Sequence, residues 1–534
     1  MQDILPPLPG LEREEEAGGL IVPRPPSEIP LQREHVGPTF VLRAVELRGN
    51  SVFAEGELQA ISEPYIGRQV DTADLEDLRR SLTRHYIDAG YVNSGALLPD
   101  QTIENGRVVF QIIEGVLGDV EISGDRRLYD GYFEDRIRLS AGPPLNVNDL
   151  QRRLRIMLDD PLIHRLDAEL TPGLRPGEGR LRLTVEEEPK ASLVARLDNA
   201  LQPSVGGEQI GMDLLLRDLT GFGETVSLSP SLAEGFIELG GHFQVPVSAH
   251  DTRLFGRMLY SRSRIVEEPF DALDIESKTY EFGIGVSQPL YRAPGKTLTA
   301  SLAHDYRVNK TFLLDNPFSF SEGAEDGRTA VSALRGMLEW VDRSQNQVIA
   351  LRSVVSLGTG LLDSTTHPGA RADSEFLSVL GQAQWVRRLG ESDARVAARA
   401  QAQWTGDRLL PMEKFSVGGV NSVRGYREDL QTGDRGWNAS LEFQIPIADL
   451  PPIVENAGSG RITVVPFVDA GRAWNVNDSS NEALLSVGAG LVWDITSDVQ
   501  ANLFVGRGLM NRPDPADKDI QDIGIHFSLS AKLY

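Results

Sequence analysis

The chain has 534 residues, and its 53 Lys and Arg against 77 Asp and Glu give a formal net charge of −24. This acidic balance argues against a nucleic-acid-binding protein, which needs a basic face. Cysteine is absent, which excludes disulfides, a thiolate nucleophile and a cysteine-based zinc site. No apolar run reaches about 18 residues, so a transmembrane helix is not expected, although short alternating β-strands would escape this test.

Residues 1–38 form a Pro-rich N-terminal arm, for which an extended and partly disordered chain is predicted. Within it, residues 11–17 are a candidate for a short helix without an apolar face. Residues 1–7 contain neither the basic nor the apolar region of a signal peptide. We therefore expect either a cytosolic protein or a mature chain whose signal peptide has been removed.

Residues 39–115 have the pattern of a strand, two helices and two further strands. The second helix is expected to start at Thr72 as N-cap and to end at Gly90, with Leu75, Leu78 and Leu82 at helical spacing. Strands are predicted over 40–47, 91–98 and 108–114.

The same order of elements repeats over residues 116–189. Its predicted strands and helices cover 116–123, 132–139, 147–159, 166–170 and 180–186. The two consecutive modules resemble POTRA domains, the polypeptide-transport-associated modules, in the order and spacing of their elements.

After Lys190 helical periodicity ends, and residues 190–534 show the alternation of β-strands. In residues 437–445 every odd position is apolar and every even one polar. The polar face carries Arg, Glu and Gln on long strands, which is typical of a water-filled barrel in lipid. The predicted fold is therefore α+β modules followed by a transmembrane antiparallel β-barrel of about 16 strands.

The connections between these strands alternate in length. Long ones are expected after odd-numbered strands, and most of those after even-numbered strands are short, which is the outer-membrane pattern. Prolines 246, 289 and 446 are expected to close strands that run inward. The long connections are predicted at 263–276, 308–328, 358–374, 406–434 and 507–520.

Two short motifs carry the functional prediction. Val423-Arg424-Gly425-Tyr426 lies in the connection between the eleventh and twelfth strands, and Phe467, Asp469 and Gly471 face the interior from the thirteenth. A carboxylate inside a narrow barrel needs a partner, and a loop folded into the barrel could deliver Arg424 to Asp469. Such a pair could gate the barrel or only stabilise it, and the sequence leaves both open.

These modules, the barrel and the two motifs together resemble the ShlB/FhaC/HecB-type haemolysin secretion and activation proteins, the TpsB transporters of two-partner secretion. The resemblance implies that Arg424 contacts Asp469, supported by Gly425, Tyr426, Phe467 and Gly471. It implies a Gram-negative outer-membrane location with periplasmic POTRA domains. It also implies as partners a secreted TpsA-type β-helical exoprotein, outer-membrane lipid and the barrel-assembly machinery.

The C-terminus is predicted to act as an assembly signal. Phe527, Leu529 and Leu533 share one face of the last strand, whereas Tyr534 falls on the other, out of the phase that is usual in the family. The family also usually has an N-terminal helix that plugs the barrel, for which residues 11–17 are a poor match.

Two other functions compete with protein export: an outer-membrane assembly factor of the BamA or TamA kind, and a porin-like channel. An assembly factor carries more POTRA modules than the two that fit before residue 190, and a porin needs none. The histidines show no metal-binding spacing and no catalytic constellation is present, so we expect neither an enzyme nor a metal or other cofactor.

Overall fold

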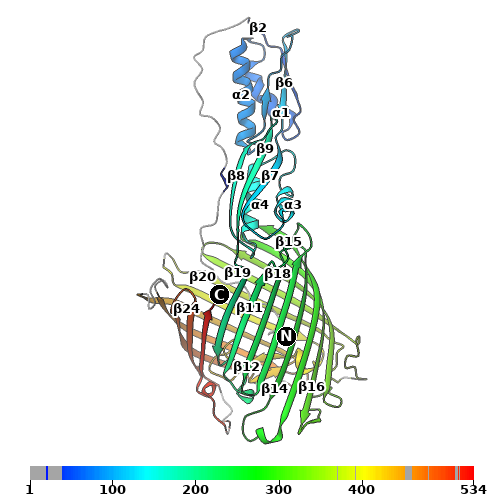
Figure 1. Cartoon of the computed structure of the whole chain (residues 1–534), viewed down its shortest axis with the longest axis vertical. Coiled ribbons are helices and arrows are strands. Elements are labelled where there is room, and N and C mark those ends of the chain that lie inside the picture. Colours follow the sequence, from blue (N-terminus) through cyan, green and yellow to red (C-terminus); the bar gives the residue numbers. More distant parts are fainter. Residues whose placement is uncertain are drawn as a thin grey trace. The chain divides into compact units, whose positions relative to one another are not determined.

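A computed structural model describes residues 20–21, 39–369, 371–390, 392–451, 460–478, 480, 482–510, 515 and 517–534. The chain forms two compact units, one within Glu15–Glu188 and one that contains Pro189–Tyr534. The first is a mixed α/β unit and the second is a barrel of antiparallel strands (Figure 1). Of the predicted N-terminal arm, all but Leu20–Ile21 lies outside the described residues, including the candidate helix at 11–17.

The first part of the α/β unit packs two helices on a small sheet. In α2 (Thr72–Asp88), apolar side chains recur at helical spacing and Leu75, Leu78 and Leu82 are buried. The sheet order is β3–β6–β5, with β3 and β6 parallel and β5 antiparallel to β6. The other elements are β2 (Phe40–Val41), β3 (Ala44–Arg48), α1 (Glu55–Ser62), η2 (Glu63–Tyr65), β4 (Gln69–Val70), β5 (Gly95–Leu97) and β6 (Arg107–Ile113).

Two local predictions in this region are wrong. The N-cap of α2 is Asp71 rather than Thr72, because the Asp71 carboxylate accepts a hydrogen bond from the Asp74 backbone N–H at 2.9 Å. The Asp74 carboxylate accepts one from the Asp71 backbone N–H in return, so the two residues form a capping box. The strand predicted over 40–47 is split at the buried Leu42, so that β2 pairs with β4 and β3 with β6.

The second part of the α/β unit repeats this order, as predicted. Its sheet has the order β1–β8–β9–β7, with β7 parallel and β8 antiparallel to β9. The two-residue strand β1 (Leu20–Ile21) adds in parallel to the edge of β8, opposite Ala168 and Glu169. The other elements are β7 (Val116–Asp125), α3 (Asp130–Arg138), α4 (Val147–Leu158), β8 (Ile163–Pro172) and β9 (Glu178–Glu187).

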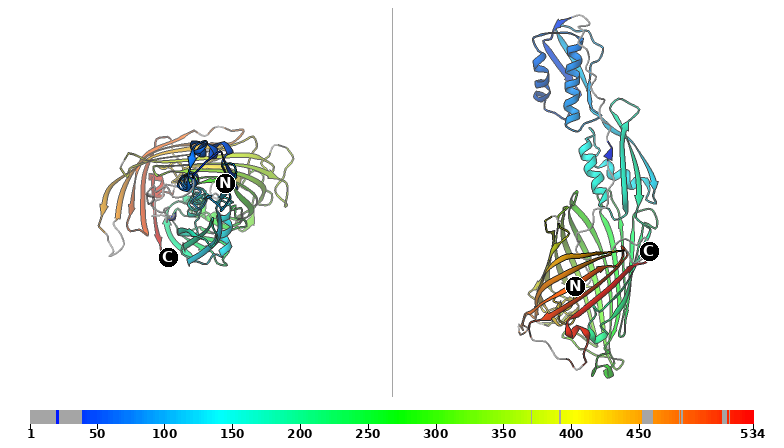
Figure 2. Two further views of the ribbon diagram at one scale, coloured as in Figure 1. Left: turned by 90° about the horizontal axis from the view of Figure 1, so that it is seen from above. Right: turned by 90° about the vertical axis from the view of Figure 1, so that its left-hand side faces the viewer.

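The larger unit is a closed barrel of 16 antiparallel strands, which confirms the predicted fold class. The last strand pairs with the first and closes the ring (Figure 2). A further two-residue strand, β17 (Asn316–Pro317), only folds back on β16. The barrel strands are β10 (Ala191–Asp198), β11 (Gln209–Arg217), β12 (Thr225–Ala233), β13 (Phe236–Pro246), β14 (Arg253–Arg264), β15 (Ile275–Ala293), β16 (Lys296–Leu313), β18 (Arg328–Arg343), β19 (Gln347–Thr359), β20 (Leu377–Arg388), β21 (Arg395–Thr405), β24 (Arg435–Leu450), β25 (Gly460–Trp474), β26 (Leu484–Asp494), β27 (Val499–Gly508) and β28 (Ile525–Lys532).

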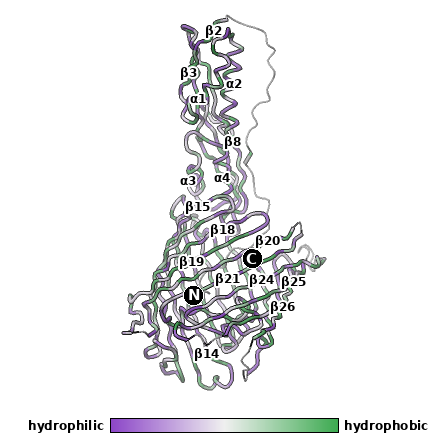
Figure 3. Tube along the Cα trace, turned by 180° about the vertical axis from the view of Figure 1, so that it is seen from behind, coloured by the Kyte–Doolittle hydropathy of each residue, from purple (hydrophilic) through white to green (hydrophobic). Residues whose placement is uncertain are grey.

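The strands form a barrel because their two faces differ. In β19, Arg352 and Ser356 face inward and are buried, while Leu351, Val355 and Leu357 at the alternate positions are exposed on the outer face. Apolar and polar stretches accordingly alternate along the traces of the barrel strands (Figure 3). An apolar outer face and a polar inner face are what a lipid-embedded barrel with a wet interior requires. None of the helices in the described part of the chain is both long and apolar enough to span a membrane.

The prediction that prolines close inward-running strands is correct for Pro246, the last residue of β13, and wrong for the other two. Strands β15 and β24 continue past Pro289 and Pro446, with the register shifted after each proline. Proline has no N–H to donate to the ladder, and a bulge removes the need for that donor without ending the strand.

The carboxylate of Glu114 connects several segments of the first part of the α/β unit, here called the first module. Glu114 accepts hydrogen bonds from the Ser51 backbone N–H at 2.7 Å, the Ser51 hydroxyl at 2.5 Å, the Val52 N–H at 3.1 Å and the Tyr86 hydroxyl at 3.1 Å. Burial raises the pKa of Glu114, but these hydrogen bonds lower it by more, so that the net pKa lies below its usual value of 4.5. The charged carboxylate thus links the segment before α1, helix α2 and the end of β6.

We predict that Glu114→Ala lowers the stability of this module by about 1–2 kcal/mol at neutral pH, because four donors lose a charged acceptor. In the unmutated protein this contribution is present above the unfolded-state pKa and is lost as the pH falls below about 4. Hydrogen exchange in α2 of the full chain, corrected for intrinsic rates, measures both effects. Equal pH dependence of the variant and the unmutated protein would contradict the prediction.

Candidate functional site

The connection between β21 and β24, residues 406–434, is here called the lumenal loop. It contains η5 (Pro411–Glu413) and a hairpin of β22 (Phe415–Val417) and β23 (Gln431–Gly433). Its apolar side chains share one buried cluster with residues of β19, β20, β25 and β26, which are spread along the wall. The loop therefore lies inside the barrel. The members of this cluster are Val354, Leu380, Phe415, Val417, Val423, Tyr426, Ala473 and Leu484.

Arg424 and Asp469, the two residues singled out from the sequence, are in contact. The guanidinium donates from Nε to Asp469 Oδ2 at 2.8 Å and from Nη2 to Oδ1 at 2.7 Å, and the Arg424 backbone N–H adds a third bond at 3.1 Å. The pair is almost fully enclosed, with 2% of Arg424 and none of Asp469 exposed. This bidentate geometry fixes the orientation of the guanidinium as well as its position.

Strand β24 supplies further partners that the sequence motifs did not indicate. Glu442 Oε1 lies 2.7 Å from Arg424 Nη1, and the Ser440 hydroxyl accepts from Nη2 at 3.0 Å. Arg399 of β21 pairs with Glu442 at 2.7 Å, so that two guanidiniums face two carboxylates. Arg424, Glu442 and Asp469 are buried, whereas Arg399 is about half exposed. Removing Arg424 or Asp469 therefore leaves a buried charge uncompensated, which typically costs about 3–5 kcal/mol.

Aromatic rings cover the face of the Arg424 guanidinium. Its central carbon lies 3.6 Å from the ring centre of Phe467 and 5.0 Å from that of Phe504. The two rings lie 6.1 Å apart and nearly edge to face. Phe467 therefore contributes a cation–π contact worth roughly 0.5–2 kcal/mol, and it shields the ion pair from water. Phe504, on β27, was not predicted as part of the site.

Glycines let the loop backbone approach the wall closely. Gly425 has a φ of +89°, and a Cβ on Gly506 of β27 would lie 2.7 Å from its backbone nitrogen. A Cβ on Gly471 of β25 would lie 2.7 Å from Val417. Both wall positions need the space that only glycine leaves. Gly506 was missed from the sequence, although it faces inward on its strand in the same phase as Phe504.

The remaining motif residues of the loop also contact the wall. Val423 is fully buried, and the Tyr426 hydroxyl donates to the Leu485 carbonyl at 3.0 Å. Arg427, which the sequence analysis did not select, pairs with Asp522 at 2.5 Å and with Glu267 at 2.6 Å. The tip of the lumenal loop is thus tied to β25, to β26 and to the connections before β15 and β28.

The predicted C-terminal residues lie away from Arg424 and Asp469. Phe527 and Leu529 are on β28 and pair with residues of β27. Leu533 and Tyr534 follow that strand and are exposed, and the Tyr534 carbonyl accepts from the Leu193 N–H at 2.8 Å. Among the residues that the structure describes, no group of three or more His, Asp or Glu side chains is placed to hold a metal ion.

The missed partners could have been found from neighbouring strands. Ser440 and Glu442 are even-numbered positions in the alternating stretch 437–445, so they share the inward face. Consecutive antiparallel strands pair, and the register places Ser440 opposite Asp469. A search for polar residues on the strand next to Asp469 would therefore have found both.

The barrel with its enclosed ion pair and the preceding α/β modules define a class, the POTRA-containing outer-membrane β-barrel transporters. Residues 177–493 match the family model described as "Haemolysin secretion/activation protein ShlB/FhaC/HecB", and residues 40–115 match "POTRA domain, ShlB-type". The chain belongs to this ShlB/FhaC/HecB family, whose members are two-partner secretion (TpsB) transporters.

Curated relatives match over most of their length. The outer membrane transporter CdiB of Dickeya dadantii is 24% identical over 86% of this chain and 82% of its own. The hemolysin transporter protein ShlB of Serratia marcescens is 23% identical over 89% of this chain and 84% of its own. The heme/hemopexin transporter protein HuxB of Haemophilus influenzae is 21% identical over 90% of this chain and 85% of its own.

Solved structures share the fold. CdiB from Escherichia coli superposes with a TM-score of 0.68 at 20% identity, over 95% of this chain and 92% of its own. BamA from Haemophilus ducreyi, lacking its POTRA domains 1–3, gives 0.51 at 14% identity, over 92% and 100%. The barrel and the preceding modules are therefore an architecture common to these proteins.

We predict that Gly506→Ala displaces the tip of the lumenal loop, because its Cβ would overlap the Gly425 backbone. Hydrogen exchange over residues 420–430 should rise at least about tenfold, which corresponds to about 1.4 kcal/mol. Gly381→Ala on β20 is the matched control, since a Cβ there meets nothing within 4 Å. Equal exchange in the two variants would show that the close approach does not hold the loop.

Proposed function

We propose that this protein exports a partner exoprotein across the outer membrane by two-partner secretion. The observation that carries the proposal is the Arg424–Asp469 pair, which holds a loop of 29 residues (406–434) inside a barrel with a polar inner face. A porin-like channel needs no modules before its barrel. The family membership and the α/β modules both favour protein export.

The α/β modules offer edges on which an extended chain can dock. Among the described residues, β5 pairs only with β6 and β7 only with β9, so each has one free edge. Leu97 on β5 and Val116 on β7 are exposed beside these edges. An unfolded exoprotein of the TpsA type would add there as a strand, held by main-chain hydrogen bonds, in the periplasm.

The barrel interior provides a route on which polar groups stay hydrated. Arg399 keeps about half of its side chain exposed while it pairs with Glu442. A polypeptide that passes such a wall need not lose its backbone hydration, which would cost several kcal/mol for each unpaired group. The long connections would then face outward, and Phe527, Leu529, Leu533 and Tyr534 would serve as the signal for the barrel-assembly machinery.

In cells that also make the partner exoprotein, we predict that Arg424→Ala and Asp469→Ala each reduce its release at least about tenfold. Each substitution leaves a buried charge without its partner, at a cost of about 3–5 kcal/mol to loop attachment. The double variant should be no worse than either single variant, since the two residues act through one interaction. The measurement is the ratio of secreted to cell-associated exoprotein at matched levels of barrel.

Arg352→Ala serves as the control, because Arg352 pairs with Glu339 on β18 and donates to Gln382 on β20, both on the wall. Normal export in both Arg424→Ala and Asp469→Ala would overturn the role of the pair. Deletion of the protein should abolish release of one partner and leave other outer-membrane proteins unaffected. A general loss of outer-membrane proteins would instead favour an assembly factor of the BamA kind, whose fold the barrel shares.

A further inference from the structure

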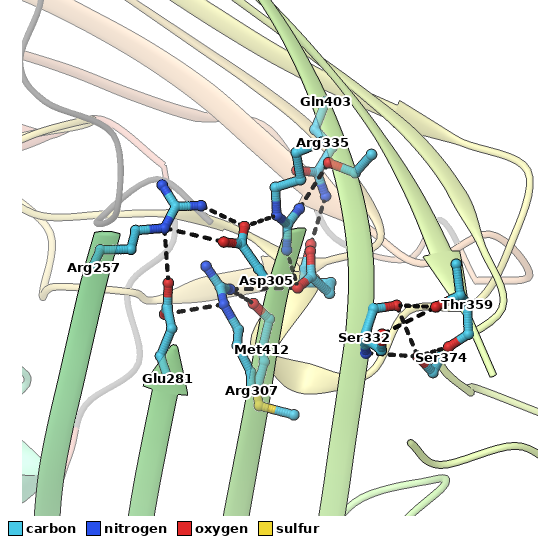
Figure 4. A network of polar contacts seen from close by, with 12 residues as sticks. Arg257, Glu281, Asp305, Arg307, Ser332, Arg335, Thr359, Ser374, Gln403 and Met412 are labelled. Carbon is cyan, nitrogen blue, oxygen red and sulfur yellow. Dashed lines mark hydrogen bonds and ion pairs between the residues drawn. The ribbon is translucent and has the colours of Figure 1, made fainter. Parts of the chain in front are cut away.

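A second cluster of buried charges lies on the inner face of β14, β15, β16 and β18 (Figure 4). Its members alternate in sign and close into a ring of six ion pairs. Going round the ring, the nitrogen–oxygen distances are 3.6, 3.0, 3.4, 2.7 and 2.7 Å, and the sixth pair, between Asp305 and Arg257, is also in contact. The ring runs Arg257, Glu281, Arg307, Glu413, Arg335, Asp305 and back to Arg257.

Five members of the ring belong to the wall, and only Glu413 belongs to the lumenal loop. Glu413 is fully buried, and its Oε1 lies 2.7 Å from Arg335 Nη2 and 3.4 Å from Arg307 Nη1. Without it, the wall would hold three arginines against two carboxylates, because Arg307 would keep only Glu281 and Arg335 only Asp305. The wall is therefore built with one positive charge in excess, which the loop neutralises.

The backbone around Glu413 is held at the same point. Arg307 Nη1 donates to the Met412 carbonyl at 3.0 Å, and the Gln403 amide of β21 donates to the Glu413 carbonyl at 2.9 Å. The turn η5 is thus fixed by both its side chain and its main chain. Next to it, Leu409 and Leu410 are buried against Val331 of β18. These contacts attach the N-terminal part of the lumenal loop, here called its first limb, to the wall.

This arrangement is the inverse of that around Arg424. There the loop brings a cation to a wall with two carboxylates, on β24 and β25. Here it brings an anion to a wall with two arginines, on β16 and β18. Because the two wall segments lie on different parts of the barrel, the loop between Glu413 and Arg424 is stretched from one to the other.

We propose that Glu413 is a positioning residue that seats the first limb of the lumenal loop against β16 and β18, and so sets the open cross-section of the barrel. The inference rests on the proposed function in taking the interior as the transport route. Loss of the Glu413 charge frees this limb while the Arg424 end stays attached. The barrel wall itself remains closed, because its strand pairing does not involve Glu413.

The test compares Glu413→Gln, Arg335→Gln, the double variant and Arg352→Gln as a control that breaks a buried ion pair within the wall. Hydrogen exchange over residues 409–417 should rise at least about tenfold in Glu413→Gln. The double variant should exchange more slowly than Glu413→Gln, because removing Arg335 as well restores the balance of charge. Arg352→Gln should match the unmutated protein in this segment.

Ion conductance in planar bilayers gives a second readout that needs no exoprotein. It should increase in Glu413→Gln and stay unchanged in Arg352→Gln, with barrel folding checked by heat-modifiable migration in gels. Exchange and conductance equal to those of Arg352→Gln would overturn the proposal, as would failure of the single and double variants alike to fold. A rise in exchange and conductance with secretion unchanged would uphold the positioning role of Glu413 and would count against the proposed export route only.

Discussion

A charge enclosed within the barrel must meet its counter-charge there, and this constraint determines the course of the lumenal loop. Asp469 and Glu442 on one part of the wall require a cation, and Arg307 and Arg335 on another require an anion. In the loop, Arg424 supplies this cation and Glu413 this anion, eleven positions apart in the sequence. Its path across the interior follows from the separation of these two sites.

The ion pairs fix the position of the loop against the wall, and apolar packing supplies much of the stability of this attachment. Buried ion pairs often contribute little net free energy because desolvation offsets their attraction, but a wrong placement leaves charges uncompensated. Phe415, Val423 and Tyr426, by contrast, are almost fully buried. At about 25 cal/mol per Å² of apolar area, such side chains contribute a few kcal/mol each.

Alternation in the sequence was sufficient to predict the barrel, the position of the long connections and the inward face of Asp469. It could not predict the partners of Glu413, because contacts across the interior depend on the tilt and stagger of the strands. Neither quantity is visible in a pattern of period two. Arg427 and Gly506 were missed for the same reason, since their neighbours lie in connections far from them in the chain. The Asp71 cap was missed because Thr72, the next residue, is also of a type that is favoured at N-caps.

The pairing of β10 with β28, here called the closing joint between strands, bears on how the protein folds. It has five residue pairs, against 18 between β15 and β16. Each of the other joints connects segments that follow one another, whereas this one connects the two ends of the barrel sequence. Contacts between distant segments form slowly, because the chain between them must first be ordered. We therefore expect ring closure to come late in barrel folding, and Gln521 adds to this contact by donating to the Asn199 and Leu201 carbonyls.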